Sequence, residues 1–150
     1  MSEPPDNPRD TQAFVLAGDL RAVLGKLKRR LRAQASTGDL TPSQRSVLLR
    51  LERDGPATAS SLARVEGMRS QSMGAVIAPL QAAGLILGKP DPNDGRQTIL
   101  SLTRACRKKI QEGRAARQDW LSRTIEAKLS IAEQEKLAKA IVLLQRLAGD

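Results

Sequence analysis

The spacing of the apolar residues changes once along this chain, and this change constrains the fold more than any other feature. Before residue 84 apolar residues recur at steps of three and four, as on one face of an α-helix. From 85 to 102 two short apolar runs flank a cluster of Pro, Asn, Asp and Gly at 90–95, which is typical of a β-hairpin. After residue 103 the helical spacing returns. The pattern predicts a mainly α-helical chain with one small β-hairpin.

Start and stop signals divide the part before residue 84 into helices. The first helix begins near Asp10 and carries one apolar stripe, made of Leu16, Leu20, Val23, Leu24, Leu27 and Leu31. A polar loop is expected at 36–39. The second helix has Thr41 as its N-cap, Pro42 at its first position and Gln44 three residues after the cap, and it ends at Gly55.

Two short helices follow, joined by a turn that contains Gly67. The first begins at Thr58 or Ala59, and the second runs from about Ser70 to Ala83, where Gly84 ends it. Two short helices with a tight turn between them and a hairpin after them form a winged helix-turn-helix. In that arrangement the second helix enters the major groove of DNA.

Two more helices are expected after the hairpin. Thr103 caps a long one that reaches about Lys128, and Ser130 with Glu133 forms a capping box for the last. The residues expected to be buried on these two helices are Ile110, Leu121, Ile125, Leu137, Ile141, Leu144 and Leu147. The fold class is then mainly α with a small β-hairpin wing (α+β).

The boundaries follow from this order of elements. Residues 1–9 are polar and rich in Pro, and we expect a disordered arm there rather than a signal peptide. Residues 10–150 are expected to form a single domain. Within it, 41–103 is the winged helix-turn-helix lobe, and the helices of 10–36 and 104–150 flank the lobe.

Composition narrows the range of functions. Lys and Arg number 25 and Asp and Glu 16, so the net charge is +9, which favours a polyanionic partner such as nucleic acid. With no His, and Cys106 as the single thiol, one chain cannot build a His/Cys metal cluster, a disulfide or a catalytic triad. The longest uncharged stretch, 70–88, is too polar for a membrane span. We expect a cytoplasmic protein that is not an enzyme, with no cofactor, no metal and no membrane partner.

At this level of detail the chain resembles the MarR family of bacterial transcription regulators. Four segments carry the resemblance: LTPSQRSVLLRLERDGPATASSLA, VEGMRSQSMGAVIAPLQAAGLI, DPNDGRQTILSLT and LSIAEQEKLAKAIVLLQRL. The resemblance implies a homodimer built from the helices of 10–36 and 104–150. It also implies binding to a palindrome-like operator in double-stranded DNA, repression, and release by a small lipophilic or phenolic effector.

The start of the second short helix holds the expected base contacts, which are Arg69, Ser70, Gln71 and Ser72. Gln can bond adenine with both amide atoms, and Ser can pair with several base edges. The alternative is that Ser70 caps the helix while Gln71 is solvated. Further along, Gly74, Ala75 and Ala78 leave the helix uncharged, and Pro79 is expected to kink or loosen it. Specificity would then depend on Gln71, on thymine methyl groups and on the wing.

The wing is expected to make the second set of contacts. In the family, an Arg at the position of Arg96 reaches into the minor groove, and narrow A·T-rich grooves attract such a residue most. Asp94 would orient the tip, either by pairing with Arg96 or by closing the turn. Lys89 is expected to contact a phosphate. The alternative is an ordinary surface turn with a solvated Arg.

Other features keep more than one interpretation. The basic run of 104–109 can face DNA or solvent, and the cluster of 26–32 is expected on the outer face of the first helix. Cys106 is expected to be a small core residue rather than a redox sensor. An effector pocket among Leu27, Leu31, Leu48, Leu51 and Trp120 is conceivable, although core packing explains these residues as well. Glu52 and Glu66 are expected at the surface. An architectural DNA-binding protein without an effector is the alternative function, and an RNA-binding module lacks its aromatic platform here.

Overall fold

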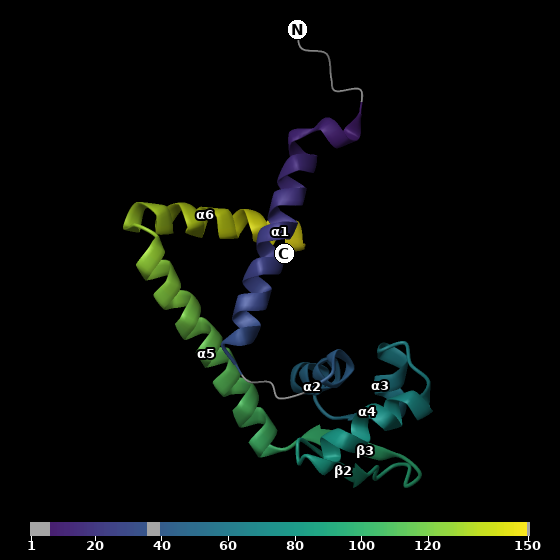
Figure 1. Cartoon of the computed structure of the whole chain (residues 1–150). Helices are drawn as coiled ribbons and strands as arrows, with labels where there is room; N and C mark the ends of the chain where they lie inside the picture. Colours follow the sequence, from purple (N-terminus) through teal and green to yellow (C-terminus); the bar gives the residue numbers. More distant parts are fainter. Residues whose placement is uncertain (1–6, 36–39, 150) are drawn as a thin grey trace. The chain divides into compact units, whose positions relative to one another are not determined.

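The structure is a computed structural model that describes residues 7–35 and 40–149 (Figure 1). Its elements follow the predicted order. They are a 3-10 turn Pro8–Asp10, α1 Gln12–Ala33, α2 Pro42–Asp54, β1 Ala57–Thr58, α3 Ala59–Val65, α4 Ser70–Ala82, β2 Ile86–Pro90, β3 Thr98–Leu102, α5 Arg104–Lys128 and α6 Ile131–Ala148. The mainly helical fold with a small wing is confirmed.

Two predicted irregular segments fall largely outside the described residues. These are the arm, as far as residue 6, and the loop at 36–39. The described end of the predicted arm is ordered locally, because Pro8–Asp10 forms a 3-10 turn. The side chain of Asn7 caps this turn, accepting a hydrogen bond from the Arg9 amide at 3.1 Å.

The predicted helix starts are confirmed by their hydrogen bonds. Thr41 and Gln44 form a capping box at α2, and Ser130 and Glu133 form another at α6. The Thr103 hydroxyl accepts from the Cys106 amide at 3.1 Å and so caps α5. Each cap satisfies an amide that the first helical turn leaves without a partner, which fixes where the helix begins.

The contacts divide the chain into two compact units, and residues 37–114 form one of them, which we call the lobe. Its core is made of side chains from α2, α3, α4, the sheet and the start of α5: Val47, Leu48, Leu51, Leu62, Ala63, Met73, Ile77, Leu80, Ile86, Leu100, Leu102 and Cys106. All are at most 6 % exposed. The core supplies the lobe's main stabilisation, because apolar area is removed from water there.

The wing has one strand more than the sequence predicts. The sheet is antiparallel with the order β1-β3-β2, and β2 pairs with β3 from Ile86↔Leu102 to Pro90↔Thr98. The added strand β1 has two residues and pairs Ala57 with Leu100. A strand this short shows no alternation in the sequence, so periodicity could not reveal it.

The second unit, residues 1–36 and 115–150, lacks a core of its own among the described residues. Neither α1 nor α6 contains a buried residue. The predicted burial of α6 is wrong for the single chain, since Ile141 is 46 % and Leu147 75 % exposed. Leu137 and Leu144 are half-buried, as are Ile110, Leu121 and Ile125 of α5. These stripes have helical spacing, but the single chain supplies too little apolar surface opposite them to bury them.

A matched pair on α3 tests the position of the core. Leu62 is 1 % exposed and Val65 is 55 % exposed. We expect Leu62→Ala to lower the free energy of unfolding by about 2–5 kcal/mol, because it removes packed methyl groups and leaves a cavity. Val65→Ala should change it by less than about 1 kcal/mol. Urea unfolding measures both, and equal losses would contradict the assignment of the core.

Candidate nucleic-acid interface

A few hydrogen bonds and one glycine fix the geometry of the helix-turn-helix. The side chain of Thr58 caps α3, accepting from the Ser61 amide at 3.1 Å. After α3 the chain reverses at Gly67, whose φ of +66° lies in the left-handed region that favours glycine. The Met68 amide then donates to the Ala63 carbonyl at 2.8 Å, which closes the turn. The start of α4 follows two residues later.

A carboxylate ties this turn to α2. Glu66 accepts hydrogen bonds from the Ser46 hydroxyl at 2.8 Å and from the Arg50 guanidinium at 2.9 Å. The Ser46 hydrogen bond, and then that of Arg50, hold the pKa of Glu66 below its usual value. Ser46 and Arg50 lie on α2, so the Glu66 side chain links the lobe's scaffold to the turn before α4.

The expectation that Glu52 and Glu66 are ordinary surface residues is wrong. The side chain of Glu66 is 15 % exposed and that of Glu52 is 18 % exposed. Two guanidinium nitrogens of Arg114 on α5 donate hydrogen bonds to the Glu52 carboxylate, and the Nη1–Oε2 distance is 3.0 Å. Each partner is more than ten positions away in the chain, so no local spacing in the sequence could reveal either pair.

Helix α4 has one buried and one exposed face. Met73, Ile77 and Leu80 are buried, whereas the four residues of the predicted contact, Arg69, Ser70, Gln71 and Ser72, are exposed. The structure makes Arg69 the N-cap, without a side-chain hydrogen bond, and Ser70 the first helical residue. The alternative in which Ser70 caps α4 is therefore wrong. Amides at a helix start that no side chain caps can bind an anion such as phosphate.

Pro79 does not end α4. The helix continues to Ala82, and the Ala83 amide donates to the Pro79 carbonyl at 3.0 Å. Gly74, Ala75 and Ala78 are all exposed, so beyond Ser72 the exposed face of α4 is made largely of small side chains. The kink at Pro79 stays a prediction.

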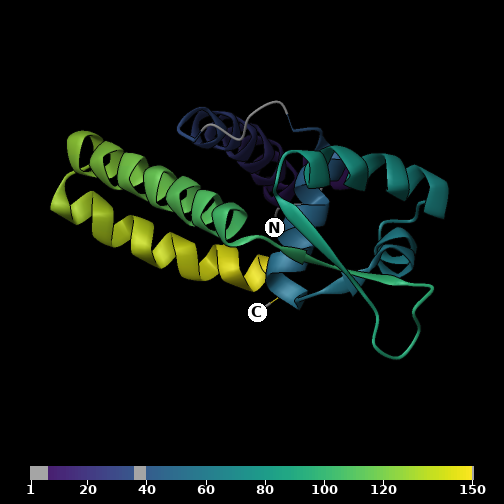
Figure 2. The ribbon, with the colours of Figure 1, turned by 90° about the horizontal axis from the view of Figure 1, so that it is seen from below.

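The wing tip is closed by its own backbone and by Asp94. The Asp91 amide donates to the Gln97 carbonyl at 2.9 Å, and Asp94 accepts from the Arg96 amide at 3.1 Å. Of the two roles expected for Asp94, the structure therefore shows turn closure, and no ion pair with Arg96 occurs among the described residues. In Figure 2 the loop that joins β2 and β3 projects away from the lobe's helices, and Arg96 on it is exposed. Lys89 on β2 is exposed as well.

The cations of the lobe fall into two groups. Arg50, Arg53, Lys108 and Arg114 lie within 4.0 Å of a carboxylate. Within the described part of the chain, a second group has no carboxylate that close, and its members are Arg45, Arg64, Arg69, Lys89, Arg96, Arg104, Arg107 and Lys109. The three predicted contacts Arg69, Lys89 and Arg96 belong to this second group, whose charge is available to a polyanion.

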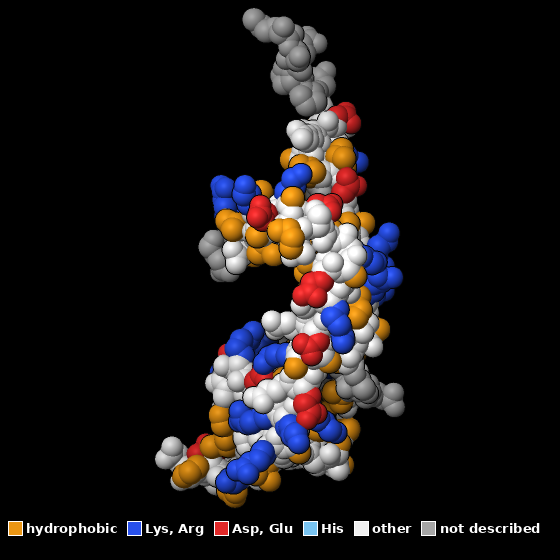
Figure 3. All heavy atoms as spheres, turned by 90° about the vertical axis from the view of Figure 1, so that its left-hand side faces the viewer, with side chains coloured by type: hydrophobic (Ala, Val, Ile, Leu, Met, Phe, Trp, Pro, Cys, Tyr) orange, Lys and Arg blue, Asp and Glu red, His pale blue; other side chains and the backbone are white. Residues whose placement is uncertain are grey.

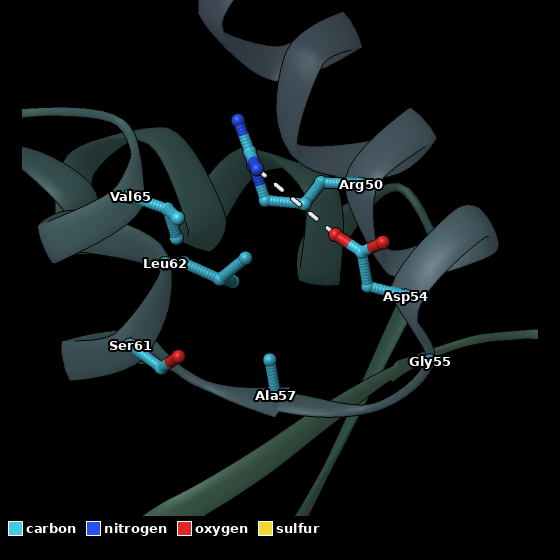
Figure 4. A pocket seen from close by; sticks show the side chains of 7 residues that line it. All are labelled: Arg50, Asp54, Gly55, Ala57, Ser61, Leu62 and Val65. Carbon is cyan, nitrogen blue, oxygen red and sulfur yellow. Dashed lines mark ion pairs between the residues drawn. The ribbon is translucent and has the colours of Figure 1, made fainter.

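The lobe also contains a small hollow and a buried thiol. A hollow of about 140 Å³ opens between α2, β1 and α3, and the Arg50–Asp54 ion pair at 4.0 Å lies along its α2 side (Figure 4). Among the described residues no three His, Cys, Asp or Glu side chains gather where they could hold a metal ion. Cys106 is 1 % exposed, and burial raises the pKa of its thiol, as expected for a core residue. Leu48 and Leu51 are core residues too.

No helix in the described ranges combines the length and apolar character that crossing a membrane requires.

Comparison with known proteins identifies the class to which this fold and surface belong. The model of the MarR family matches residues 40–98. An uncharacterised HTH-type transcriptional regulator of Mycobacterium bovis, Mb0904, is 34 % identical over 135 residues, which is 90 % of this chain and 94 % of that protein. The chain therefore belongs to the MarR family of winged helix-turn-helix transcriptional regulators, which are DNA-binding proteins and not enzymes.

Solved structures agree with this assignment. The crystal structure of a putative transcriptional regulator from Pseudomonas aeruginosa is 37 % identical and superposes with a TM-score of 0.79, covering 93 % of this chain and 99 % of that one. A Staphylococcus aureus MepR mutant bound to an oligodeoxyribonucleotide is 22 % identical with a TM-score of 0.69, covering 88 % of this chain and 97 % of that one. At that identity the MepR likeness shows the shared fold.

The link at Glu66 makes the stability of the lobe depend on pH. Because the pKa of Glu66 is lowered, its ionised form stabilises the fold, and this contribution is lost as pH falls through the carboxyl range. We expect the difference in unfolding free energy between wild type and Glu66→Gln to be largest near neutral pH and to shrink below about pH 4. Denaturant unfolding over a pH series measures it.

Glu135→Gln is the matched control for this measurement. Glu135 is exposed and makes no hydrogen bond or ion pair with any other described residue. Its substitution should change the free energy of unfolding by less than about 1 kcal/mol at neutral pH. A Glu66→Gln difference that does not change with pH would contradict the role of the ionised carboxylate.

Proposed function

We propose that this protein is a homodimeric repressor that binds a palindrome-like operator with α4 and the wing of each lobe. The observation that carries the proposal is Arg96 at the end of the wing, which is exposed and has no carboxylate of the described residues within 4.0 Å. A guanidinium held at a projecting hairpin suits a narrow minor groove, because the negative potential is strongest there.

Helix α4 is the proposed reader of the major groove. Its buried face, with Met73 and Ile77, orients Ser70, Gln71 and Ser72 away from the core. The Gln71 amide can bond adenine, and the small residues Gly74, Ala75 and Ala78 would let the helix approach thymine methyl groups closely. Arg69 and Lys89 would position the lobe through phosphate contacts, which carry no sequence information.

The second unit supplies the argument for a dimer. Its helices expose large apolar side chains that the single chain leaves in water, including Leu16, Val23 and Leu24 of α1 and Ile141, Val142 and Leu147 of α6. A second copy would cover these stripes symmetrically, since a two-fold interface uses the same patch on both subunits. A two-fold dimer also matches a palindrome, because each lobe meets an equivalent half-site.

Repression and effector release rest on membership of the family. A dimer bound beside its own gene or a neighbouring gene would exclude RNA polymerase from the same DNA. We infer that a small lipophilic or phenolic compound releases it. The alternative is an architectural DNA-binding protein with no effector, which the small, uncharged face of α4 favours.

Two substitutions test the roles of the wing and α4. Arg96→Ala should cost about 1–3 kcal/mol of binding to an operator duplex taken from DNA beside the protein's own gene. Gln71→Ala should weaken the operator complex while leaving binding to random duplex unchanged, because it removes a base contact and no charge. Arg53→Ala is the control for Arg96, since Arg53 is paired with Asp54 at 3.0 Å. Titration of labelled duplex measures all three, and an Arg96→Ala protein that binds like Arg53→Ala would remove the wing from the mechanism.

A charge placed on the stripe of α6 tests the dimer. Ile141→Glu should shift the protein to monomer in sedimentation equilibrium, because the carboxylate would be buried unpaired in the interface. Ala132→Glu is the control, since Ala132 is exposed and lies nine residues away, on the opposite side of the same helix. If Ile141→Glu stays dimeric, the stripe of α6 is not part of the interface.

A further inference from the structure

The C-terminal half of α1 carries a dense group of positive charges that takes no part in the proposed operator contacts. Five of the seven residues of 26–32 are basic and none is acidic, and we call Lys26, Lys28, Arg29, Arg30 and Arg32 the α1 basic cluster. All five side chains are exposed. No carboxylate of the described residues lies within 4.0 Å of any of them. The cluster belongs to the second unit, outside the lobe that carries the wing and α4.

Helix geometry separates the cluster from the apolar stripe of α1. Arg29 lies nine residues, or two and a half turns, after Leu20 and so faces the opposite side of the helix. Lys26 and Arg32 flank it, each about 60° away around the helix axis, whereas Lys28 and Arg30 lie nearer the edges of the stripe. Gly25, one turn before Arg29, has no side chain, and the Arg29 guanidinium lies beside it, since a Cβ built there would be 3.6 Å from Nη1. A partner of the outer side therefore need not compete with a second copy of the chain on the stripe.

Helix stability does not account for this density of charge. Cations in the last turn favour a helix through its dipole, and this explains Arg30 and Arg32. Lys26, Lys28 and Arg29 lie further from the end. Moreover, Lys26–Arg30 and Lys28–Arg32 are like-charge pairs at i,i+4, which destabilise a helix. An anionic partner would reduce this repulsion between the cations of the cluster.

The spacing of the charges matches a nucleic-acid duplex. Residues 26–32 rise about 9 Å along the helix, so the five cations average one charge per about 2 Å. Duplex DNA carries one negative charge per about 1.7 Å of its axis. Three of the five are Arg, whose planar guanidinium binds phosphate with two parallel hydrogen bonds. Figure 3 colours Lys and Arg side chains blue, and several groups of them lie at the surface of the face that it draws.

We propose that the α1 basic cluster is a second DNA-binding surface, which holds the phosphate backbone of duplex DNA outside the operator contacted by α4 and the wing. Duplex DNA is favoured over an anionic membrane because lipid insertion needs the apolar stripe of α1, which the dimer would occupy. The bound backbone belongs either to the flank of the operator duplex or to a separate duplex. The surface contributes affinity and no sequence preference.

The test uses a random-sequence duplex, so its result does not depend on operator selection. The variant Lys26→Gln/Arg29→Gln/Arg32→Gln removes three charges from the outer side, and Gln keeps the helix propensity. The control Arg123→Gln/Lys136→Gln/Arg146→Gln removes the same residue types from exposed positions of α5 and α6. Both variants lower the net charge from +9 to +6, since 9 − 3 = 6. Circular dichroism and sedimentation establish that each is helical and associates like wild type.

The salt dependence of the affinity is the readout. Each lost phosphate contact lowers the slope of log K against log salt by about 0.9, so the cluster variant should lose about 2–3 units of slope and the control less than one. Equal losses in both variants would mean that net charge alone acts, which overturns the proposal. An unchanged slope in the cluster variant overturns it too. If the triple variant fails to fold, Lys26→Gln/Arg30→Gln should lose about 1–2 units, and an unchanged slope again refutes the surface.

Three further measurements distinguish the flank of the operator from a separate duplex, and failure of the α1 basic cluster from failure of the lobe. A labelled random duplex recruited to protein already saturated with an operator duplex indicates a separate duplex, whereas extra affinity for a longer operator fragment indicates the flank. In the lobe variant Arg69→Ala/Arg96→Ala, adding the three Gln substitutions of the cluster variant should lower the salt slope by about 2–3 units, as it does in wild type. Vesicles of phosphatidylcholine and phosphatidylserine form the last arm. If the cluster variant loses vesicle binding while its DNA slope is unchanged, the surface is a membrane site and the proposal is wrong.

Discussion

The apolar core of the lobe is the constraint on which the rest of the structure depends. Met73 and Leu80 of α4 pack with residues of α2 and α3, and Leu100 and Leu102 bring β3 against the same core. Burying one face of α4 decides which residues the other face presents. Because β3 is anchored in this core and pairs along its length with β2, the wing tip is held at a fixed place relative to α4. A reader of DNA needs this rigidity, since its base contacts and phosphate contacts must be made together.

The two units differ in what the single chain satisfies. The lobe buries the apolar residues of its core, and it pairs Glu52 with Arg114 and Glu66 with Arg50. No described carboxylate lies within 4.0 Å of the predicted cationic contacts Arg69, Lys89 and Arg96. The second unit leaves its apolar stripes exposed and carries the dense charge of 26–32 without partners among the described residues. Both conditions are costly for a chain in isolation, and a second subunit and duplex DNA would relieve them. In the proposed complex the lobe would specify sequence, whereas the helices of the second unit would assemble the dimer and add affinity.

Features that depend on residues close together in the sequence could be predicted. Caps such as Thr41 and Ser130 depend on residues three positions apart, and so the helix starts could be predicted. The link of Glu66 to Ser46 and the two-residue strand β1 depend on contacts between distant positions, and no spacing reveals those. The burial of Ile141 and Leu147 was predicted from a stripe that a single chain does not cover. For the site, exposure of Arg69, Gln71 and Arg96 agrees with the prediction, whereas their contacts to DNA stay a prediction.

The measurement that tests this account most directly is a footprint on the DNA beside the protein's own gene, with random duplex as competitor over a salt series. The account predicts a two-fold-symmetric footprint whose half-site centres lie about 10–10.5 base pairs, or a multiple of this, apart. Binding to that DNA should exceed binding to random duplex by about 10³ or more. Equal affinity for both DNAs, falling steeply with salt, would contradict operator recognition and leave an architectural DNA-binding protein.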